Sequence, residues 1–558
     1  MKEKTQKPSV FNWLNKRTAG QKAKMVWLII VNALFSMLSV VFAFAIKGVI
    51  DGATNENRET GEFQLIVSAI LIIAVIFLQF VFRIVINGLT EHIKGKLEIS
   101  VKGNLFNQIL VKKYEKINKV HSGELINRIT ADAVIVADGI SSIVPTVVSA
   151  SVRLICAVIA LVYLDWIFAI AFIVAGGLVF IILTATRGLL KNLHKKTQET
   201  DGKTRSFMQE CIENLLAIKV FSIENKTSNK ADELQDENFK IKMKRKNVSV
   251  LGHASYNLIF SAGYVFALVY GALKILNEGM SYGSLSAILQ LVNNVQVPFA
   301  SLSSIAPKYF SMVASAERIM EIEDYEEEIK NKNFNASKVY ENLSSIEIKD
   351  LAFSYDRDVV FEKASLSINK GDFLAITGTS GIGKSTLIKL LLGVYEIENG
   401  SLIIKGKEDI EINSSTRKLF AYVPQGNSLF SGKLKENLCF VDREVTNEEI
   451  EKALEISCLK DFVKDLPNGL DTIIGENGLG LSEGQAQRVA IARAILSKAP
   501  VLLFDESTSA LDETTEEKLL SNLKNIKDVT LIIITHRKSA LAICNRKVKI
   551  QGKKIIES

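Results

Sequence analysis

The chain of 558 residues is poor in the residue types that build disulfide frameworks, metal clusters and frequent turns. It holds only 5 cysteines, 5 histidines and 7 prolines. The cysteines show no CxxC spacing and the histidines are scattered, which argues against a disulfide-stapled domain and against a zinc site. Scarce proline also removes the commonest helix breaker, so long helices are permitted.

Acidic residues are missing from six long apolar segments in the first 306 residues. A helix needs about 20 apolar residues to cross a bilayer, and each segment meets that length. The first follows a Lys-rich stretch without a small-residue cleavage pattern, which favours a spanning helix over a removable signal peptide. The predicted spans are 25–46, 63–89, 140–163, 166–186, 251–276 and 285–306.

The charges that flank the first span predict its orientation. Residues 1–24 hold seven Lys or Arg and one acid, whereas loop 51–62 holds four acids and one Arg. The positive-inside rule therefore places both termini in the cytoplasm, and we expect the chain in a bacterial plasma membrane. Because Lys and Arg flank the apolar segments, we interpret the net charge of +7 as that of a membrane protein, and we expect contact with membrane lipids and no nucleic-acid partner.

Two long polar segments, 90–139 and 187–250, separate the spans on the cytoplasmic side. They are highly charged, contain little Pro or Gly, and keep apolar residues at helical spacing, as at Leu105, Ile109 and Leu110. We interpret them as spanning helices that continue into the cytoplasm. Two separate helical linker domains are the alternative.

The pattern changes at about Ser345 to short β-branched runs that alternate with helices. Several runs are continuously apolar, as expected of a sheet that is buried on both faces. The predicted strands are 374–378, 401–406, 421–424, 501–505 and 530–536.

The sequence GTSGIGKST follows the first of these strands and precedes a helical run. This is the context of a phosphate-binding P-loop, in which backbone N–H groups and a helix start surround the phosphates. Lys384 is expected to reach the β and γ phosphates of ATP, and the Ser385 hydroxyl to bind Mg²⁺. The alternative is a chance glycine-rich turn. The loop residues are Gly378, Thr379, Ser380, Gly381, Ile382, Gly383, Lys384, Ser385 and Thr386.

Two acids follow the apolar run VLLF and are expected to do different work. Asp505 ends the strand and would hold Mg²⁺ through water. Glu506 comes next and would orient and deprotonate the attacking water. A structural salt bridge is the alternative for either acid, and the four preceding apolar residues argue against it.

With LSEGQ at 481–485, which matches the ABC signature, the chain resembles an ABC half-transporter of the exporter type over essentially its whole length. The implied fold is a membrane domain of six transmembrane helices with long cytoplasmic extensions, fused to an α/β P-loop ATPase domain. The implied parts are an N-terminal segment 1–24 with an interfacial helix, a transmembrane domain 25–325, a linker 326–344 and a nucleotide-binding domain 345–558. A frayed basic tail is the alternative to the interfacial helix.

The resemblance implies further roles at single positions. Tyr355 resembles the aromatic residue that stacks on adenine, and His536 the switch histidine that touches the γ-phosphate. Gln425 resembles the glutamine that contacts Mg²⁺ and the attacking water, and Glu476 an acid that contacts the membrane domain. The implied sets are catalytic Glu506, His536 and Gln425; nucleotide-binding Tyr355, 378–386, Gln425, Ser482, Gly484, Gln485, Asp505 and Asp512; and, for Mg²⁺, Ser385, Gln425 and Asp505.

Two positions depart from the family pattern. Glu483 replaces the usual second glycine of the signature, and Asn477 replaces a usual arginine. Glu483 would stand near the γ-phosphate of a partner's ATP and could repel it. Glu506 is intact, so the chain does not resemble the degenerate half of an asymmetric pair.

The chain carries one P-loop, one signature and six predicted spans, whereas each ATP in this family lies between the P-loop of one chain and the signature of another. Ser482 and Gly484 would then act in trans, and a homodimer is the simplest assembly. The resemblance also places coupling helices in the internal loops, near 131–137 or upstream and near 211–224.

The substrate is predicted from polar groups inside the spans, which are functional candidates. Arg153 lies mid-span without an acidic partner in any span, and it faces water, backbone carbonyls or the substrate. Gln290, Asn293, Asn294 and Ser301 share roughly one helical face, which indicates a polar cavity or hydrogen bonds between helices.

We therefore predict ATP-driven export by alternating access of a peptide or another polar or amphipathic molecule. The alternatives are a lipid flippase or multidrug exporter on the same scaffold, an ATP-gated channel or sensor, and an importer.

Overall fold

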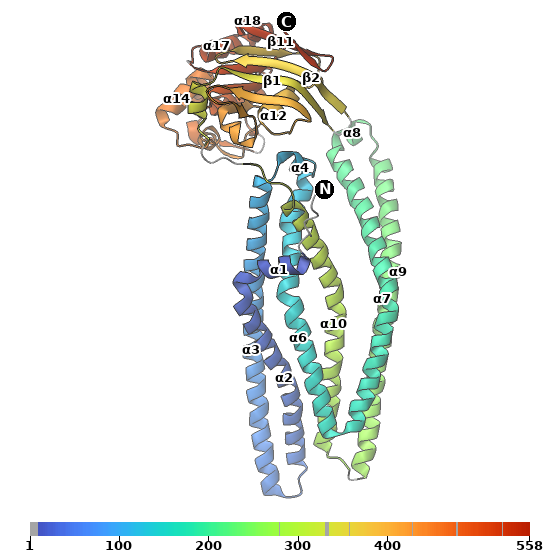
Figure 1. The fold of residues 1–558 in the computed structure, drawn as a ribbon. Coiled ribbons are helices and arrows are strands. Elements are labelled where there is room, and N and C mark those ends of the chain that lie inside the picture. The colour runs from blue at the N-terminus through green and yellow to red at the C-terminus, as the bar shows by residue number, and fades with distance from the viewer. Residues whose placement is uncertain are drawn as a thin grey trace. The chain divides into compact units, whose positions relative to one another are not determined.

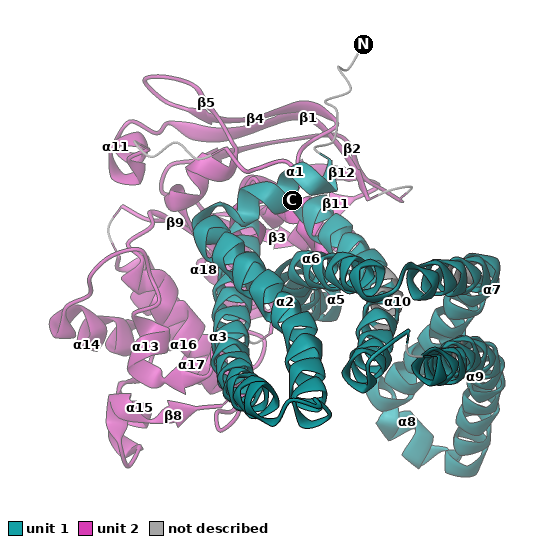
Figure 2. Ribbon diagram, turned by 90° about the horizontal axis from the view of Figure 1, so that it is seen from below, with its two compact units in different colours: residues 1–108, 122–323 teal, residues 109–121, 324–558 magenta. Residues whose placement is uncertain are grey.

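The computed structural model describes residues 9–277, 279–329, 334–355, 358–426, 428–475, 478–526 and 528–557. The chain divides into two compact units, coloured teal and magenta in Figure 2. One unit comprises residues 1–108 and 122–323, and the other comprises residues 109–121 and 324–558. The second unit therefore includes a short segment, 109–121, from the first quarter of the chain.

The first unit is built of helices that extend far beyond the thickness of a bilayer. Helices α3 (Arg58–Val111), α7 (Trp166–Glu213) and α9 (Glu224–Leu276) have 54, 48 and 53 residues, whereas about 20 suffice to cross the hydrocarbon core. The prediction that the spans continue as helices into the polar segments is confirmed. The other elements are α1 (Val10–Arg17), a 3-10 turn (Ala19–Gln21), α2 (Lys22–Ala53), α5 (Ser122–Asn127), a π-helical turn (Arg128–Asp132), α6 (Ala133–Leu164), α8 (Leu215–Val220) and α10 (Tyr282–Glu323).

Within the described residues, five helical stretches are long and apolar enough to cross a membrane. They contain the first five predicted spans. The sixth predicted span, 285–306, lies on α10, and several of its side chains fall outside the description. Ile70, Ile73 and Phe77 of α3 are 62, 68 and 67 % exposed. Such a row of large apolar side chains is stable against lipid and unfavourable against water.

Helices α2, α6 and α10 pack on one another, while α7 and α9 run side by side (Figure 1). Fully buried alanines lie in these interfaces, among them Ala43 of α2, Ala157 of α6 and Ala287 of α10. Small side chains let neighbouring backbones approach closely, which is how helices gain van der Waals contact within a bilayer.

Helix α1 is tied to the end of α10. The indole Nε1 of Trp13 donates a hydrogen bond of 2.7 Å to Glu323, and Arg17 forms an ion pair with the same carboxylate. The Arg17 guanidinium also lies over the Trp13 ring, 5.3 Å from its centroid. A frayed tail is therefore the wrong description of residues 10–17, while their position on the inner leaflet stays a prediction.

The second unit contains two main sheets. The larger has the strand order β12-β11-β3-β10-β9-β6, in which only β12 is antiparallel to its neighbour. The smaller is antiparallel, with the order β2-β1-β4-β5. The strands are β1 (Ser345–Tyr355), β2 (Asp358–Asn369), β3 (Phe373–Thr377), β4 (Asn399–Lys405), β5 (Ile410–Glu411), β6 (Phe420–Val423), β9 (Val501–Asp505), β10 (Thr530–Ile534), β11 (Arg546–Gln551) and β12 (Lys554–Glu557), with β7 (Gly432–Lys433) and β8 (Ile473–Ile474) as a separate pair.

All five predicted strands are present, as β3, β4, β6, β9 and β10. Every residue of β9 and β10 is buried, because other elements cover both faces of the parallel sheet. The helices of this unit are α4 (Tyr114–Asn118), α11 (Ala336–Glu341), α12 (Lys384–Leu391), α13 (Leu434–Leu438), α14 (Asn447–Ile456), α15 (Lys460–Asp465), α16 (Glu483–Leu496), α17 (Glu513–Lys524) and α18 (Lys538–Ile543).

Candidate functional site

The glycine-rich loop joins the end of β3 to the start of α12. Gly378, Gly381 and Gly383 have φ angles of +148°, +77° and +109°, in the left-handed region that only glycine adopts readily. A Cβ on Gly383 would also lie 2.4 Å from Val360 Cγ1, so no side chain fits there. Thr379, Ser380 and Gly381 form the exposed part of the loop. The loop leaves its backbone N–H groups and the start of α12 free to surround an anion.

Lys384 is the first residue of α12, and its side chain turns back into the loop. It is 6 % exposed, and its Nζ donates to the carbonyl oxygens of Gly378 at 2.9 Å and Thr379 at 3.2 Å. The same Nζ lies 3.8 Å from Glu506 Oε1. The ammonium is thus held where the loop would bring a phosphate chain.

Ser385 and Asp505 are brought together by α12 and β9. The Ser385 hydroxyl donates to Asp505 Oδ1 at 3.0 Å, and Tyr422 of β6 donates to Oδ2 at 3.2 Å. Burial raises the pKa of Asp505 and the Glu506 charge adds to it, while the two hydroxyl groups oppose the shift. A hydroxyl beside a carboxylate is a pair of hard oxygen ligands of the type that Mg²⁺ takes.

Tyr422 did not emerge from the sequence reasoning. It stands three residues before Gln425, on a strand that is hydrogen-bonded to β9. The order of strands in the sheet is what places it on Asp505.

Glu506 has an unusual backbone conformation, with φ of +50°. Such a conformation is costly for a residue with a side chain and persists only where the surroundings impose it. Its N–H donates to Ile534 of β10, and its carboxylate accepts a hydrogen bond of 2.8 Å from the Gln425 amide. The loop lysine, Asp505, Glu506 and Gln425 therefore meet at the carboxyl edge of the parallel sheet, where ligands of such sheets bind.

Tyr355 and His536 lie near this edge. Tyr355 ends β1, is 37 % exposed, and its hydroxyl lies 3.4 Å from the Thr386 hydroxyl of α12. His536 follows β10 and its side chain is exposed. Glu476, for which the family resemblance also implied a role, and Asn477, where the chain departs from the family pattern, lie outside the described residues.

The signature residues form a second group at the start of α16. The Ser482 hydroxyl accepts from the Gln485 N–H, and the Gln485 side chain accepts from the Ser482 N–H, a reciprocal capping box. A Cβ on Gly484 would lie 2.8 Å from the Ala510 carbonyl oxygen, so the helix start packs directly on the following loop. In the part of the chain that the structure describes, no hydrogen bond joins Ser482 or Gln485 to loop 378–386.

Arg537 organises the loop 509–512 beside this helix start. Its guanidinium donates to the carbonyl oxygens of Ser509 at 2.8 Å and Leu511 at 2.6 Å. Asp512 then caps α17 by accepting from the Thr515 N–H at 2.8 Å. Hydrogen bonds from the neighbouring threonines hold the pKa of Asp512 below its ordinary value. The sequence reasoning did not identify Arg537 as the residue that shapes this loop.

Within the helical unit, Arg153 lies at the interface of α6 and α2. Its Nε donates to the Ser39 hydroxyl at 3.1 Å, and the Ser39 carbonyl accepts a bond of 3.0 Å from Asn294 of α10. Arg153 is half-buried, and no acidic side chain among the described residues pairs with it. Among the described residues, no hydrogen bond or ion pair involves its two terminal nitrogens.

The polar residues of α10 differ in how far they are buried. Asn294 is buried on α2, Asn293 is exposed, and Gln290 is half-buried. Ser301 donates to Val297 of its own helix. Asn294 therefore forms a hydrogen bond between two helices. Such bonds were the alternative to a polar cavity in the sequence analysis.

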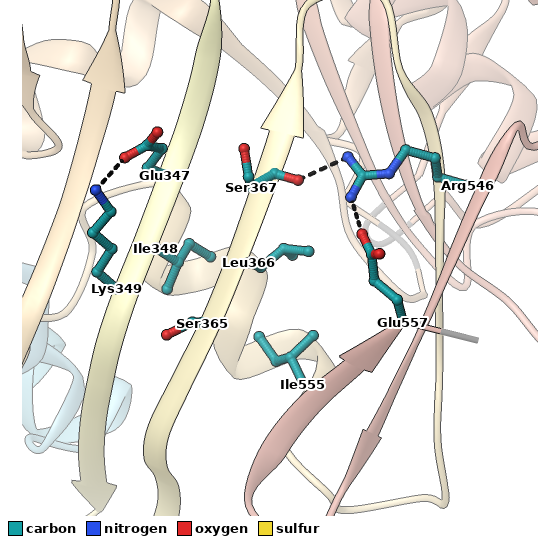
Figure 3. Close-up of a pocket in the computed structure, with 9 residues that line it drawn as sticks. All are labelled: Glu347, Ile348, Lys349, Ser365, Leu366, Ser367, Arg546, Ile555 and Glu557. Atoms are coloured by element: carbon teal, nitrogen blue, oxygen red, sulfur yellow. Dashed lines mark hydrogen bonds and ion pairs between the residues drawn. The ribbon is translucent and has the colours of Figure 1, made fainter.

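A groove of about 340 Å³ lies elsewhere on the second unit, between strands β1 and β2 and strands β11 and β12 (Figure 3). Arg546 closes one side by donating to the Ser367 carbonyl and pairing with Glu557. None of the site residues predicted from the sequence is among those that line it. The lining residues are Glu347, Ile348, Lys349, Ser365, Leu366, Ser367, Arg546, Ile555 and Glu557.

Comparisons with known proteins give consistent matches. The family model described as ABC transporter transmembrane region matches residues 25–299, and the model described as ABC transporter matches residues 361–509. An ATP-dependent lipid A-core flippase of Desulfotalea psychrophila is 27 % identical over 537 residues, which is 94 % of this chain and 92 % of the relative. The same-named protein of Escherichia coli K12 is 27 % identical over 504 residues, 89 % of this chain and 86 % of the relative.

A solved structure of a bacterial Atm1-family ABC exporter with ATP bound superposes with a TM-score of 0.82 at 22 % sequence identity. The match covers 96 % of this chain and 94 % of that chain. At this identity the likeness establishes the fold.

Proposed function

The chain belongs to the ABC transporter family, with an exporter-type membrane domain and an ATPase domain in one polypeptide, and on this premise we propose that it flips an anionic amphipathic lipid across its membrane. It is an integral membrane protein in which ATP hydrolysis is coupled to transport.

The position of Arg153 is the observation that supports an anionic lipid as the substrate. A guanidinium among membrane-spanning helices costs at least about 2.5–3.5 kcal/mol if it faces lipid tails, so it needs a polar or anionic partner. Ser39 satisfies one of its nitrogens, and the others remain available. A phosphate or carboxylate headgroup would accept two hydrogen bonds from this planar fork.

The names of the relatives support a lipid over a peptide. The relatives from Desulfotalea psychrophila and Escherichia coli are described as ATP-dependent lipid A-core flippases, and each match covers most of both chains. The lipid flippase, which the sequence offered as an alternative, therefore becomes the preferred substrate class. The preference for a peptide has no support among these relatives.

Each predicted residue of the ATPase domain has a role in ATP binding or hydrolysis under this proposal. The loop N–H groups and Lys384 bind the β and γ phosphates, and Tyr355 stacks on the adenine. Ser385, Asp505 and Gln425 would hold Mg²⁺, which supplies positive charge against the phosphate oxygens. Glu506 accepts the proton of the attacking water, and its hydrogen bond from Gln425 holds the carboxylate in place. His536 would contact the γ-phosphate.

We infer that two copies of the chain form the working transporter. Ser482, Gly484 and Gln485 lie in a group that is separate from the P-loop of the same chain, so a second chain would complete each nucleotide site. ATP would close two ATPase domains on each other, and hydrolysis would release them. Both termini and the ATPase domain would lie in the cytoplasm, because the first 24 residues carry the excess of Lys and Arg.

Arg153→Ala is expected to abolish most flipping of anionic lipid while basal ATPase activity stays near that of the unmodified protein. Loss of a charged hydrogen-bonding partner costs about 1.5–3 kcal/mol, or roughly tenfold or more in binding. The measurement compares translocation of fluorescent phosphatidylglycerol and fluorescent phosphatidylcholine in proteoliposomes. Arg153→Lys should retain part of the activity, because the charge persists without the planar fork.

Lys47→Ala, which removes a cation near the end of the first predicted span, is the matched control and should leave the lipid preference unchanged. If Arg153→Ala prevents assembly and the protein that survives flips anionic lipid normally, Arg153 is structural. If Arg153→Ala lowers the translocation of phosphatidylcholine and of phosphatidylglycerol equally, the proposal that the substrate is an anionic lipid is wrong.

Glu483→Gly is expected to lower the apparent KM for ATP severalfold. Glu483 begins α16 with an exposed side chain. Two like charges about 4 Å apart repel by up to about 4 kcal/mol at intermediate dielectric, and bound Mg²⁺ reduces this. Steady-state ATPase measurements over a range of ATP concentrations test the effect.

Glu483→Gln should behave similarly, because it also removes the charge. Glu448→Gln, in the first turn of α14, removes a comparable charge away from the site and should change nothing. An unchanged or higher KM for Glu483→Gly would mean that this side chain points away from the nucleotide.

A further inference from the structure

A row of aromatic rings links α4 to the candidate adenine-binding residue. The Tyr114 and Tyr395 rings meet edge-on with centroids 6.1 Å apart, and Tyr395 meets Tyr355 edge-on at 5.4 Å. Phe353 lies behind, 4.9 Å from Tyr355 and 5.7 Å from Tyr395. Edge-to-face pairs at these distances attract each other, and each ring limits the positions open to the next.

The segment 109–121 that carries Tyr114 is fixed to the ATPase unit by charges. Lys113 Nζ lies 2.5 Å from Glu326 and 2.6 Å from Glu396, the residue after Tyr395. Hydrogen bonds with these two carboxylates raise the pKa of Lys113. A short antiparallel bridge between Lys112 and Glu327 adds backbone pairing to the contact.

The segment that follows α10 is bound to the same part of the ATPase unit. Arg417 forms a double ion pair with Glu328, at 2.7 and 2.9 Å, and also donates to the carbonyl oxygens of Leu392 and Gly393. The turn that carries Tyr395 is therefore held from both sides, by segment 109–121 and by the start of the linker. Segment 109–121 lies between α3 and α5 in the chain, so Tyr114 is covalently continuous with helices of the first unit.

At the other end of the row, Tyr355 reaches the P-loop helix. Its hydroxyl lies 3.4 Å from that of Thr386, which is buried in α12. Tyr395 is half-buried, and burial raises its pKa to about 12, with smaller contributions from Tyr355 and Tyr114. The ring stays uncharged over the working pH range, so it acts through its position and contacts.

We propose that Tyr395 is a positioning residue for the nucleotide base, which holds Tyr355 in place and links base occupancy to the docking of α4 through Tyr114. The proposal rests on the assignment of Tyr355 to adenine. Two groups that order each other share a coupling free energy, and that coupling acts in both directions. Base binding therefore steadies Tyr114, and a well-docked Tyr114 favours base binding.

Steady-state ATPase of the full-length protein in proteoliposomes tests the row. Tyr395→Leu should raise the KM for ATP about twofold to tenfold, the affinity equivalent of losing one or two aromatic pairs, while kcat at saturating ATP changes little. Tyr395→Phe should keep a KM near that of the unmodified protein, because the ring remains. The Ki of inorganic tripolyphosphate, which has no base, should stay unchanged in both variants.

Tyr114 tests the far end of the row, because its ring meets Tyr395, which in turn meets Tyr355. Tyr114→Leu should raise the KM for ATP by up to about threefold, and Tyr114→Phe should not. Lys116→Ala is the matched control, since it removes a cation of α4 that pairs with Glu115 of the same helix and leaves both the rings and the Lys113 ion pairs in place. It should leave the KM for ATP unchanged if the rings carry the coupling.

Tyr355→Leu tests the assignment of Tyr355 to adenine separately from the role of the aromatic row. If it leaves the KM for ATP unchanged, Tyr355 does not bind the base and both the assignment and the row are wrong. If Tyr355→Leu raises the KM but Tyr395→Leu does not, the assignment holds and the row is overturned. If Tyr395→Leu shifts the tripolyphosphate Ki as much as the KM for ATP, Tyr395 supports the P-loop helix in general, and the proposal is again overturned.

Discussion

Replacing Glu506 with glutamine is expected to lower ATP turnover about 10²–10⁴-fold, the usual contribution of a general base, while ATP binding is retained. Glutamine keeps the size of the side chain and loses the group that accepts a proton. The position is specific, because β9 ends at Asp505 and the φ of +50° turns Glu506 toward Gln425 and Lys384. The measurement is steady-state ATPase in proteoliposomes together with nucleotide retention on the same protein.

Two variants give this experiment its controls. Glu517→Gln removes an exposed carboxylate from α17 and should leave turnover unchanged. Lys384→Ala should weaken ATP binding itself, because it removes the buried ammonium from the loop. Near-normal turnover in Glu506→Gln would show that Glu506 is not the general base.

Mixed dimers of Ser482→Arg and Lys384→Ala chains should recover ATP binding that neither variant shows alone. In a mixed dimer, one site combines the intact loop of the Ser482→Arg chain with the intact signature of the Lys384→Ala chain. If the two chains pair at random, about a quarter of all sites are intact. The basis is the separation of the two groups within one chain, where the N–H and the hydroxyl of Ser482 bond with Gln485 of its own helix.

The experiment co-expresses the two chains with different tags and isolates the mixed species before ATP binding is measured. Two pure variants mixed after purification, without exchange of subunits, provide the baseline. Binding in the mixed species no better than this baseline would show that each site is built within one chain.

The apolar pattern predicted most of the fold. The five runs of β-branched residues became strands, and the long polar segments with little Pro or Gly became helices that continue the spans. Both patterns are strong because burial on two faces or exposure to lipid requires nearly unbroken apolar sequence. Strands β1 and β2 were missed, since they alternate buried and exposed residues and offer no continuous run.

The contacts of segment 109–121 with the ATPase unit could not be predicted from the sequence. Residues 109–121 look like a continuation of α3 in the sequence, because polar and apolar residues still alternate at helical spacing there. The partners of Lys113 are Glu326 and Glu396, more than two hundred residues away. Nothing local in the sequence marks such a pairing.

The sequence by itself determined the chemistry of this protein: the glycine loop with Lys384 and Ser385, the acids 505 and 506, the signature, and the apolar spans with Arg153. Each depends on local spacing, which the chain carries in order. The tertiary structure decided which of these groups meet. Parallel strand order brings Tyr422 to Asp505, and Arg417 and Lys113 bring Tyr395 between Tyr114 and Tyr355. Such contacts depend on pairings between distant segments, which are selected by the packing of the whole domain and not by the residues on either side.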